Sequence, residues 1–161
     1  AGQQIVWDTL EREGIPYRVI EHEAVYTVEA MDQLNLPQYG TILKNLFLRD
    51  NKGKRHFLLC VPESCTIDLK SLRTVLGTTN LSFASAERME KYLGVSPGSV
   101  SPFGILNDDG RCVEVVFDES LRGNESVGVH PNENTATVFL RFEDLLRVVE
   151  SHGNQVSVIA L

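Results

Sequence analysis

Two apolar runs of strand length, joined by a polar turn, set the first limit on how this chain folds. The runs cover residues 42–49 and 55–61, and the turn between them reads Asp50-Asn51-Lys52-Gly53-Lys54. Strand-forming residues on both sides of a short loop that contains glycine are typical of a β-hairpin. The chain is therefore expected to contain a β-sheet in which at least these two strands run antiparallel.

Other helix and strand patterns alternate along the rest of the chain. Apolar residues at helical spacing predict helices before Gly14, from Thr27 to Pro37, from Asp68 to Gly77, from Ser85 to Gly94 and before Gly153. Runs of strand formers predict strands over residues 17–22, 113–118, 135–140 and 156–160. Hairpins outnumber β-α-β units in this order. We therefore expect an α/β fold of the α+β type, with one mixed β-sheet packed with helices, rather than a doubly wound nucleotide-binding fold.

The size and charge of the chain narrow the classes of function. With 161 residues, of which 42% are hydrophobic, residues 1–161 are expected to form a single domain with its own core. The apolar stretches are strand-sized and the N-terminus lacks a basic leader, so we expect a cytoplasmic protein that does not span a membrane. A net charge of −7 argues against DNA binding through a broad basic face, so any nucleic-acid contact must be local.

One local concentration of positive charge surrounds the predicted turn. It consists of Arg49, Lys52, Lys54 and Arg55. These side chains can contact nucleic acid, or they can form an ordinary solvated hairpin tip, since charged turns are common. The sequence alone leaves both interpretations open.

The commonest catalytic signatures do not occur in this sequence. It contains no G-x-x-x-x-G-K-[ST] phosphate loop, no strand-linked G-x-G-x-x-G, no H-E-x-x-H and no G-x-S-x-G elbow. The histidines are not separated by the i, i+4 spacing of a helical metal-ligand pair. We therefore expect neither a metal nor another cofactor.

Three local features remain as candidates for a functional site. Lys44 stands in an apolar strand, where a cation is costly unless it meets an anion, although simple alternation also allows a lysine on the solvated side of the hairpin. Residues 94–104 are rich in glycine, proline and serine, so their backbone N–H groups can approach an anion, or they form an ordinary irregular loop. His130, in the segment 128–134, can position a substrate or move a proton, or simply bond to the backbone.

Three segments occur in a fixed order along the chain: Lys44-Asn45-Leu46-Phe47-Leu48, Ser99-Val100-Ser101-Pro102-Phe103-Gly104-Ile105 and Val129-His130-Pro131-Asn132-Glu133-Asn134-Thr135-Ala136-Thr137. Together they resemble the YbaK/ProX superfamily of tRNA editing domains, which is related to the editing insertion of bacterial prolyl-tRNA synthetase. The resemblance begins near Tyr17 and continues to the C-terminus. The long loop and the last segment favour the free-standing ProX type over the YbaK cysteinyl branch.

The resemblance implies an enzyme that hydrolyses, in trans, the ester between an amino acid and the terminal adenosine of tRNA. A prolyl site rejects the smaller alanine poorly, since a missing methylene is worth only about 1–3 kcal/mol, so a second and smaller sieve is needed. The expected substrate is mischarged Ala-tRNA(Pro), and the expected partners are the acceptor end of tRNA(Pro) and, as a further candidate, prolyl-tRNA synthetase. The alternatives are a deacylase for Cys-tRNA(Pro) or another small aminoacyl-tRNA, and a non-catalytic tRNA-binding module.

The resemblance also implies roles for individual residues. Lys44 matches the essential lysine of the superfamily and is expected to hold the terminal phosphate or the ester end of the substrate. Asn45 and His130 are expected to orient the substrate or the attacking water, and backbone groups near Gly104 and Gly128 are candidates to stabilise the oxyanion. Residues expected to bind the substrate are Met31, Ile42, Ser101, Pro102, Phe103 and Asn134, and residues expected to meet the acceptor stem are Arg49, Lys52, Lys54 and Arg55.

Overall fold

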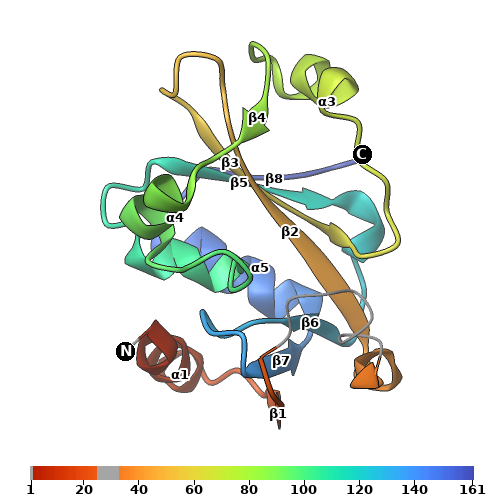
Figure 1. Ribbon diagram of the computed structural model, residues 1–161. Helices are drawn as coiled ribbons and strands as arrows, with labels where there is room; N and C mark the ends of the chain where they lie inside the picture. The colour runs from red at the N-terminus through yellow and green to blue at the C-terminus, as the bar shows by residue number, and fades with distance from the viewer. Residues whose placement is uncertain (1, 25–32) are drawn as a thin grey trace.

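A twisted mixed sheet runs through the molecule (Figure 1). The computed structural model describes residues 2–24 and 33–161, and its strands are β1 (Arg18–Glu21), β2 (Thr41–Arg49), β3 (His56–Pro62), β4 (Ser82–Phe83), β5 (Val113–Asp118), β6 (Val127–Val129), β7 (Ala136–Leu140) and β8 (Val156–Ile159). They lie in the order β1-β7-β6-β2-β3-β5-β8, with β4 also paired to β2. The pairs β2–β3, β2–β4, β1–β7 and β6–β7 are antiparallel, whereas β2–β6, β3–β5 and β5–β8 are parallel. The expected mixed sheet packed with helices is confirmed.

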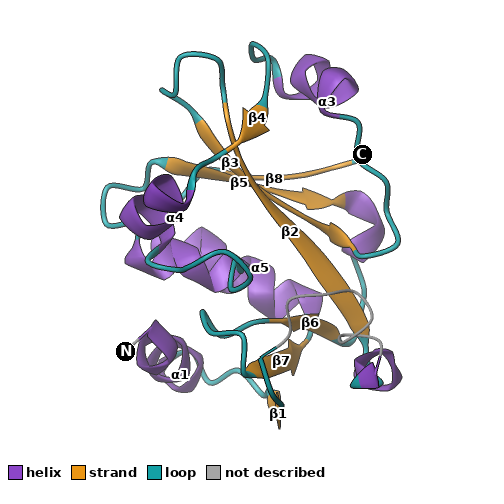
Figure 2. Cartoon of the chain, in the orientation of Figure 1, coloured by secondary structure: helices purple, strands orange, loops and turns teal. Residues whose placement is uncertain are grey.

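Helices cover both faces of this sheet (Figure 2). The α-helices are α1 (Gly2–Arg12), α3 (Leu69–Leu76), α4 (Ala86–Leu93) and α5 (Phe142–His152), and short 3-10 helices span Leu36–Tyr39, Pro102–Asn107 and Glu119–Leu121. The predicted caps of α3 and α4 are confirmed, since the side chains of Asp68 and Ser85 each accept a backbone N–H of the first turn. The helix predicted from Thr27 falls mostly outside the described residues. No helix in the described ranges is long and apolar enough to cross a membrane.

Alternating side chains of β2 enter two different apolar clusters. Phe47 packs with the cluster under α1, α4 and α5, which also contains the buried Phe103 and Phe142. Its neighbour Leu48 packs with the cluster that contains Leu72 of α3. Successive residues of a strand point to opposite faces, so β2 contributes to the core on both sides of the sheet.

Several short elements were not predicted from the sequence. Residues 82–83 and 127–129 form β4 and β6, because runs this short show too little periodicity to be recognised. The region 94–104 was expected to be irregular, but its last residues begin the 3-10 helix Pro102–Asn107. The longer strands agree with their predicted bounds to within one residue at each end.

One edge of β2 is paired only at its two ends. On this edge β6 pairs with Thr41 and Ile42, and β4 pairs with Leu48 and Arg49. Within the described part of the chain, residues 43–47 have no strand partner here. These five residues are called the open edge of β2 below.

The hydrogen-bond pattern shows which backbone groups face the open edge. The N–H of Glu63 donates to the carbonyl of Ile42 on the β3 side at 2.9 Å, whereas the N–H of Ala84 donates to the carbonyl of Phe47 on the other side at 2.9 Å. Backbone groups of alternate residues point to alternate edges of a strand. The N–H and C=O of Asn45 therefore face the open edge.

Candidate active site

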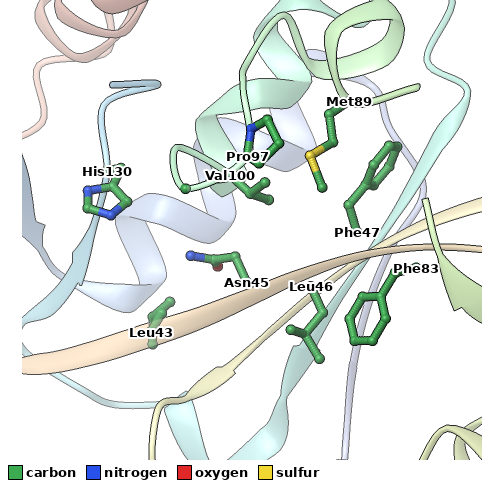
Figure 3. A pocket seen from close by; sticks show the side chains of 10 residues that line it. Leu43, Asn45, Leu46, Phe47, Phe83, Met89, Pro97, Val100 and His130 are labelled. Atoms are coloured by element: carbon green, nitrogen blue, oxygen red, sulfur yellow. The ribbon is translucent and has the colours of Figure 1, made fainter. Parts of the chain in front are cut away.

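A cleft at the open edge of β2 brings Asn45 and His130 to opposite walls of one cavity (Figure 3). Its volume is about 300 Å³, at the lower end of the range for small-molecule sites. Two of the predicted residues, which lie far apart in the sequence, thus share one cavity. The cleft is lined by Leu43, Asn45, Leu46, Phe47, Phe83, Met89, Pro97, Gly98, Val100 and His130.

A much smaller chamber adjoins this cleft and shares Leu43, Asn45 and His130 with it. Its volume is about 20 Å³, and by the same measure a single water-sized group needs roughly 10–15 Å³. The chamber therefore has room for one group the size of a methyl. Its lining consists of Ile42, Leu43, Asn45, Gly128, Val129, His130 and Thr137.

Gly128 keeps the walls of the chamber close together. A Cβ atom at this position would lie 2.7 Å from Cε1 of Phe139 and 2.9 Å from Cδ1 of Ile42. Such contacts are too short for any side chain to be added without displacing these neighbours. Gly128 was predicted as a candidate because its backbone could stabilise an oxyanion. The structure adds a steric role for this glycine.

The ring of His130 is held in one orientation by the backbone. Its Nδ1 lies 3.0 Å from the carbonyl oxygen of Ala136, and because a carbonyl only accepts, Nδ1 donates the proton. Burial lowers the pKa of His130, the bond to Ala136 opposes this shift, and the nearby His22 lowers the pKa further. The ring is therefore neutral near pH 7, with Nε2 as an acceptor. The interpretation of His130 as a histidine that bonds to the backbone is confirmed, and the ring also lines the cleft, where its role toward a substrate stays a prediction.

A second histidine supports the floor of the chamber. Nδ1 of His22 lies 2.8 Å from the carbonyl oxygen of Glu23 and therefore donates to it, so Nε2 accepts the hydroxyl proton of Thr137 at 2.9 Å. Thr137 is buried and lines the chamber, and its hydroxyl oxygen keeps the capacity to accept a further hydrogen bond. The sequence did not indicate this pair, because its members are 115 residues apart and no local motif joins them.

Asn45 offers polar groups to the cleft from both its backbone and its side chain. The side-chain Oδ1 is buried and has no hydrogen-bond partner among the described residues. An unpaired buried acceptor costs about 1–3 kcal/mol, and a donor on a bound substrate would remove this cost. Asn45 is thus suited to hold an N–H or O–H group.

Lys44 lies on the opposite face of β2 from Asn45. It is half-buried, and its ammonium group donates a hydrogen bond to the carbonyl oxygen of Cys65 in the segment after β3. Lys44 lines neither the cleft nor the chamber. The structure therefore does not bring Lys44 together with Asn45 and His130, and a substrate must extend around the open edge to meet all three.

The segment 101–104, which contains three predicted substrate-binding residues and the oxyanion candidate Gly104, is part of the protein core. Ser101 Oγ accepts the N–H of Phe103 at 3.1 Å, which caps a 3-10 helix, and Phe103 is fully buried. The N–H of Gly104 donates to the carbonyl of Ser101 at 2.9 Å, and a Cβ on Gly104 would lie 3.0 Å from Leu93. Neither these residues nor the buried Pro102 line the cleft. The loop residues that do line it, Pro97, Gly98 and Val100, precede them in the glycine- and proline-rich stretch.

The remaining substrate-binding candidates are dispersed. Ile42 lines the chamber, and Asn134 is buried just before β7 without lining the chamber or the cleft. Met31 lies outside the described residues. The cleft residues Phe47, Phe83 and Met89 were not predicted, because nothing in their local sequence distinguishes them from ordinary core positions.

The four basic residues of the β2–β3 turn have different environments. Arg55 binds Glu114 through two hydrogen bonds of 2.9 Å and 3.0 Å. Arg49 donates to the carbonyl groups of Asp50 and Asn51 within the turn itself. In the described part of the chain, the exposed Lys52 and Lys54 form no ion pair. These two lysines are therefore the most accessible positive charges of the turn.

Comparison with known proteins identifies the family. The model of the aminoacyl-tRNA editing domain matches residues 22–148, a range that includes Asn45, Gly128, His130 and Thr137. The chain belongs to this family. It is a member of the YbaK/ProX superfamily, as the three sequence segments indicated.

Individual members of the family resemble the whole chain. The prolyl-tRNA editing protein ProX of Acetoanaerobium sticklandii is 48% identical over 159 residues, which cover 99% of this chain and 97% of that protein. The multifunctional Ser/Thr-tRNA deacylase ProXp-y of Escherichia coli is 29% identical over 143 residues, or 88% of this chain and 84% of that protein. A solved structure, described as a candidate trans-editing enzyme for prolyl-tRNA synthetase, superposes with a TM-score of 0.74 at 25% identity and covers 98% of this chain and 95% of its own. The chain is an aminoacyl-tRNA deacylase, an ester hydrolase.

Proposed function

We propose that this deacylase edits tRNA(Pro) in trans and removes alanine from mischarged Ala-tRNA(Pro). The choice of tRNA is supported by the relative of 48% identity, which is named a prolyl-tRNA editing protein. The choice of amino acid rests on one observation, the chamber of about 20 Å³ beside Asn45 and His130. A methyl side chain fits a space of this size, whereas the larger cyclic side chain of proline does not.

In this proposal the ester lies between Asn45 and His130. Nε2 of the neutral His130 accepts a proton from water as the water oxygen bonds to the ester carbon. The backbone N–H of Asn45, which faces the open edge, donates to the oxyanion that develops on the carbonyl oxygen. The bond between the carbonyl carbon and the ribose oxygen then breaks, and the ribose oxygen receives the proton from His130. The side-chain Oδ1 of Asn45 accepts a hydrogen bond from the α-amino group or from the ribose hydroxyl that remains free.

In this proposal Lys44 contacts the phosphate backbone of the tRNA and not the ester. Its ammonium group lies on the reverse face of β2, so it can meet the phosphate of the terminal nucleotide once the chain of the tRNA passes around the open edge. A charge-assisted contact of this kind stabilises substrate binding and the transition state equally. Lys44 is therefore expected to affect KM more than kcat.

Serine is the second candidate amino acid, and Thr137 is the observation that favours it. The hydroxyl of Thr137 donates to His22, so its oxygen can accept a hydrogen bond from a serine hydroxyl in the chamber. The relative from Escherichia coli is named a Ser/Thr-tRNA deacylase, and both of these amino acids carry a hydroxyl group, which supports serine as a candidate. A hydroxyl and a methyl differ little in size, so the chamber separates serine from alanine less sharply than it separates alanine from proline.

The test is a deacylation assay with tRNA(Pro) that carries alanine, serine, cysteine or proline. We expect alanine to be removed fastest and proline to remain attached. His130→Ala should remove most of the activity on alanine, whereas Thr137→Val should slow removal of serine more than removal of alanine. Faster hydrolysis of the cysteinyl or seryl ester would contradict the choice of alanine, and tRNA binding without hydrolysis of any ester would contradict the catalytic assignment of the cleft.

A further inference from the structure

Phe83 is exposed to solvent although it belongs to the wall of the cleft. Its side chain is 61% exposed, more than any other large apolar side chain among the described residues. Its position is fixed by β4, because Phe83 pairs with Leu48 of β2 and the next residue, Ala84, donates to the carbonyl of Phe47. A large aromatic ring is thus held in water at the rim of the cavity that contains Asn45.

The ring of Phe83 lies on the face of β2 opposite to the catalytic groups. Residues paired directly across two strands share a face of the sheet, so Phe83 lies on the side of Leu48 and of Leu46. Figure 3 shows Phe83 beside Leu46 on one side of β2, and Asn45 on the other. The cleft therefore passes around the open edge of the strand and has an apolar shelf, Leu46 and Phe83, on the far side.

Phe47 and Tyr92, two other described aromatic residues in this region, already contact other rings inside the protein. Phe47 is buried and stacked against His56, with a centroid separation of 5.6 Å, and His56 in turn contacts Tyr92 in a tilted arrangement at 4.2 Å. Phe83 forms no ring contact with another described aromatic residue. Its face is available to a planar ligand.

We propose that Phe83 is the stacking platform for the 3′-terminal adenine of the tRNA. This inference rests on the proposed function, because the ester must occupy the cleft between Asn45 and His130. The adenine is joined to the ribose that carries the ester, so it must lie at the rim of the cleft when the ester is inside. Bases stack on exposed aromatic side chains in single-stranded nucleic-acid sites, and this platform is already in place before binding.

The placement of Lys44 agrees with this path. Lys44, Leu46 and Leu48 alternate along β2 and share the face on which Phe83 lies. A nucleotide on this face presents its base to Phe83 and its phosphate toward Lys44, while its ester passes over the open edge to Asn45. One nucleotide in this position accounts for an exposed aromatic ring and a lysine outside the cleft.

The experiment compares two acceptor-stem substrates, both carrying alanine on the terminal ribose. One has adenine at the terminal position, and the other has an abasic ribose there. For the adenine substrate, Phe83→Ala should raise KM roughly ten-fold and leave kcat nearly unchanged, whereas Phe83→Trp should retain most of the affinity. On the abasic substrate the wild type and Phe83→Ala should have the same KM. Val75→Ala is the matched control, since Val75 is 53% exposed on α3 and does not line the cleft.

The outcomes separate this inference from the proposed function. If the wild type hydrolyses the ester and Phe83→Ala has an unchanged KM, or is weakened equally on both substrates, adenine stacking is wrong while the deacylase assignment stands. If the wild type hydrolyses neither substrate, affinity for uncharged acceptor stems with and without the terminal adenine still tests the platform. A difference in affinity that Phe83→Ala removes supports stacking, and no difference overturns it.

Discussion

Lys44 and Asn45 are neighbours in β2, and their side chains leave opposite faces of the sheet. The ammonium group of Lys44 donates to the carbonyl of Cys65, whereas Asn45 lines the cleft together with His130. Two adjacent residues can thus contact different parts of one substrate without competing for space. This separation predicts that their substitutions have different kinetic effects.

Lys44→Ala should raise KM about ten-fold or more and change kcat little, because a contact with phosphate is formed equally in the ground state and the transition state. Asn45→Ala should lower kcat by about 10- to 100-fold, because it removes a group that orients the ester. Steady-state deacylation of Ala-tRNA(Pro) at low and high salt measures both effects, and only the defect of Lys44→Ala should shrink as salt is raised. A defect confined to kcat for Lys44→Ala would place the lysine at the ester instead.

Gly128→Ala should close the chamber and lower the free energy of unfolding by about 1–3 kcal/mol, since overpacking of a buried site costs this much. The added Cβ meets Phe139 and Ile42 at less than 3 Å. Deacylation of Ala-tRNA(Pro) should fall strongly, and urea unfolding measures the stability. Gly2→Ala is the control, because its Cβ would have an ordinary contact of 3.4 Å with Asn132. Normal alanine removal by a folded Gly128→Ala variant would show that the amino acid binds elsewhere.

The activity should persist at lower pH than an ordinary histidine would allow. Burial lowers the pKa of His130, and only the neutral ring can accept a proton from water. The acid limb of kcat/KM should therefore lie below the usual histidine pKa of about 6.5. His22→Gln should move this limb toward higher pH, because His22 contributes to the lowered pKa of His130. Rates measured from about pH 5 to about pH 8, corrected for spontaneous ester hydrolysis, test both statements, and a limb above the ordinary pKa would contradict them.

Stability should fall in mild acid because of His56. Burial lowers the pKa of this histidine, and Arg88, whose Nη1 donates to Nε2 of His56 at 2.9 Å, lowers it further. The unfolded chain therefore binds the proton first, so stability decreases as pH falls below about 6.5 and levels off below the folded-state pKa. Urea unfolding at several pH values should show this decrease, and His56→Gln should reduce it. An unchanged slope in the variant would assign the effect to other groups.

The elements of the fold that have local signals were predictable. The hairpin that contains Lys44 and the helix caps Asp68 and Ser85 follow from neighbouring residues alone, and the structure agrees with them. The strand that contains Gly128 was not predicted, because it depends on pairing with β2, which is remote in sequence. The sequence around Ile42, which pairs with Gly128 of β6, also carries no local signal of this contact.

The candidate site was predictable only in part, for the same physical reason. Asn45, Gly128 and His130 were singled out from the sequence and do line one cavity system. Alternation in a strand already places the adjacent Lys44 and Asn45 on opposite faces of β2, but the sequence could not show which of the two faces the cleft, because both faces of this strand are apolar. Nor could it show that Phe103 fills the core, since a motif identifies residue types and not the direction of their side chains.

The basic turn provides the last prediction. Lys52 and Lys54 are exposed and form no ion pair with described residues, whereas Arg55 is engaged by Glu114. If this turn meets the acceptor stem, Lys52→Glu with Lys54→Glu should weaken tRNA affinity and lower the salt slope of log K by about 0.7–0.9 for each phosphate that the turn no longer neutralises. The matched control is Arg12→Glu with Arg122→Glu, which reverses two exposed charges outside the turn and keeps the same net charge. Equal weakening in the two double variants would indicate a general electrostatic effect, whereas weakening confined to the turn variant, with kcat on bound substrate unchanged, would assign the turn to tRNA binding.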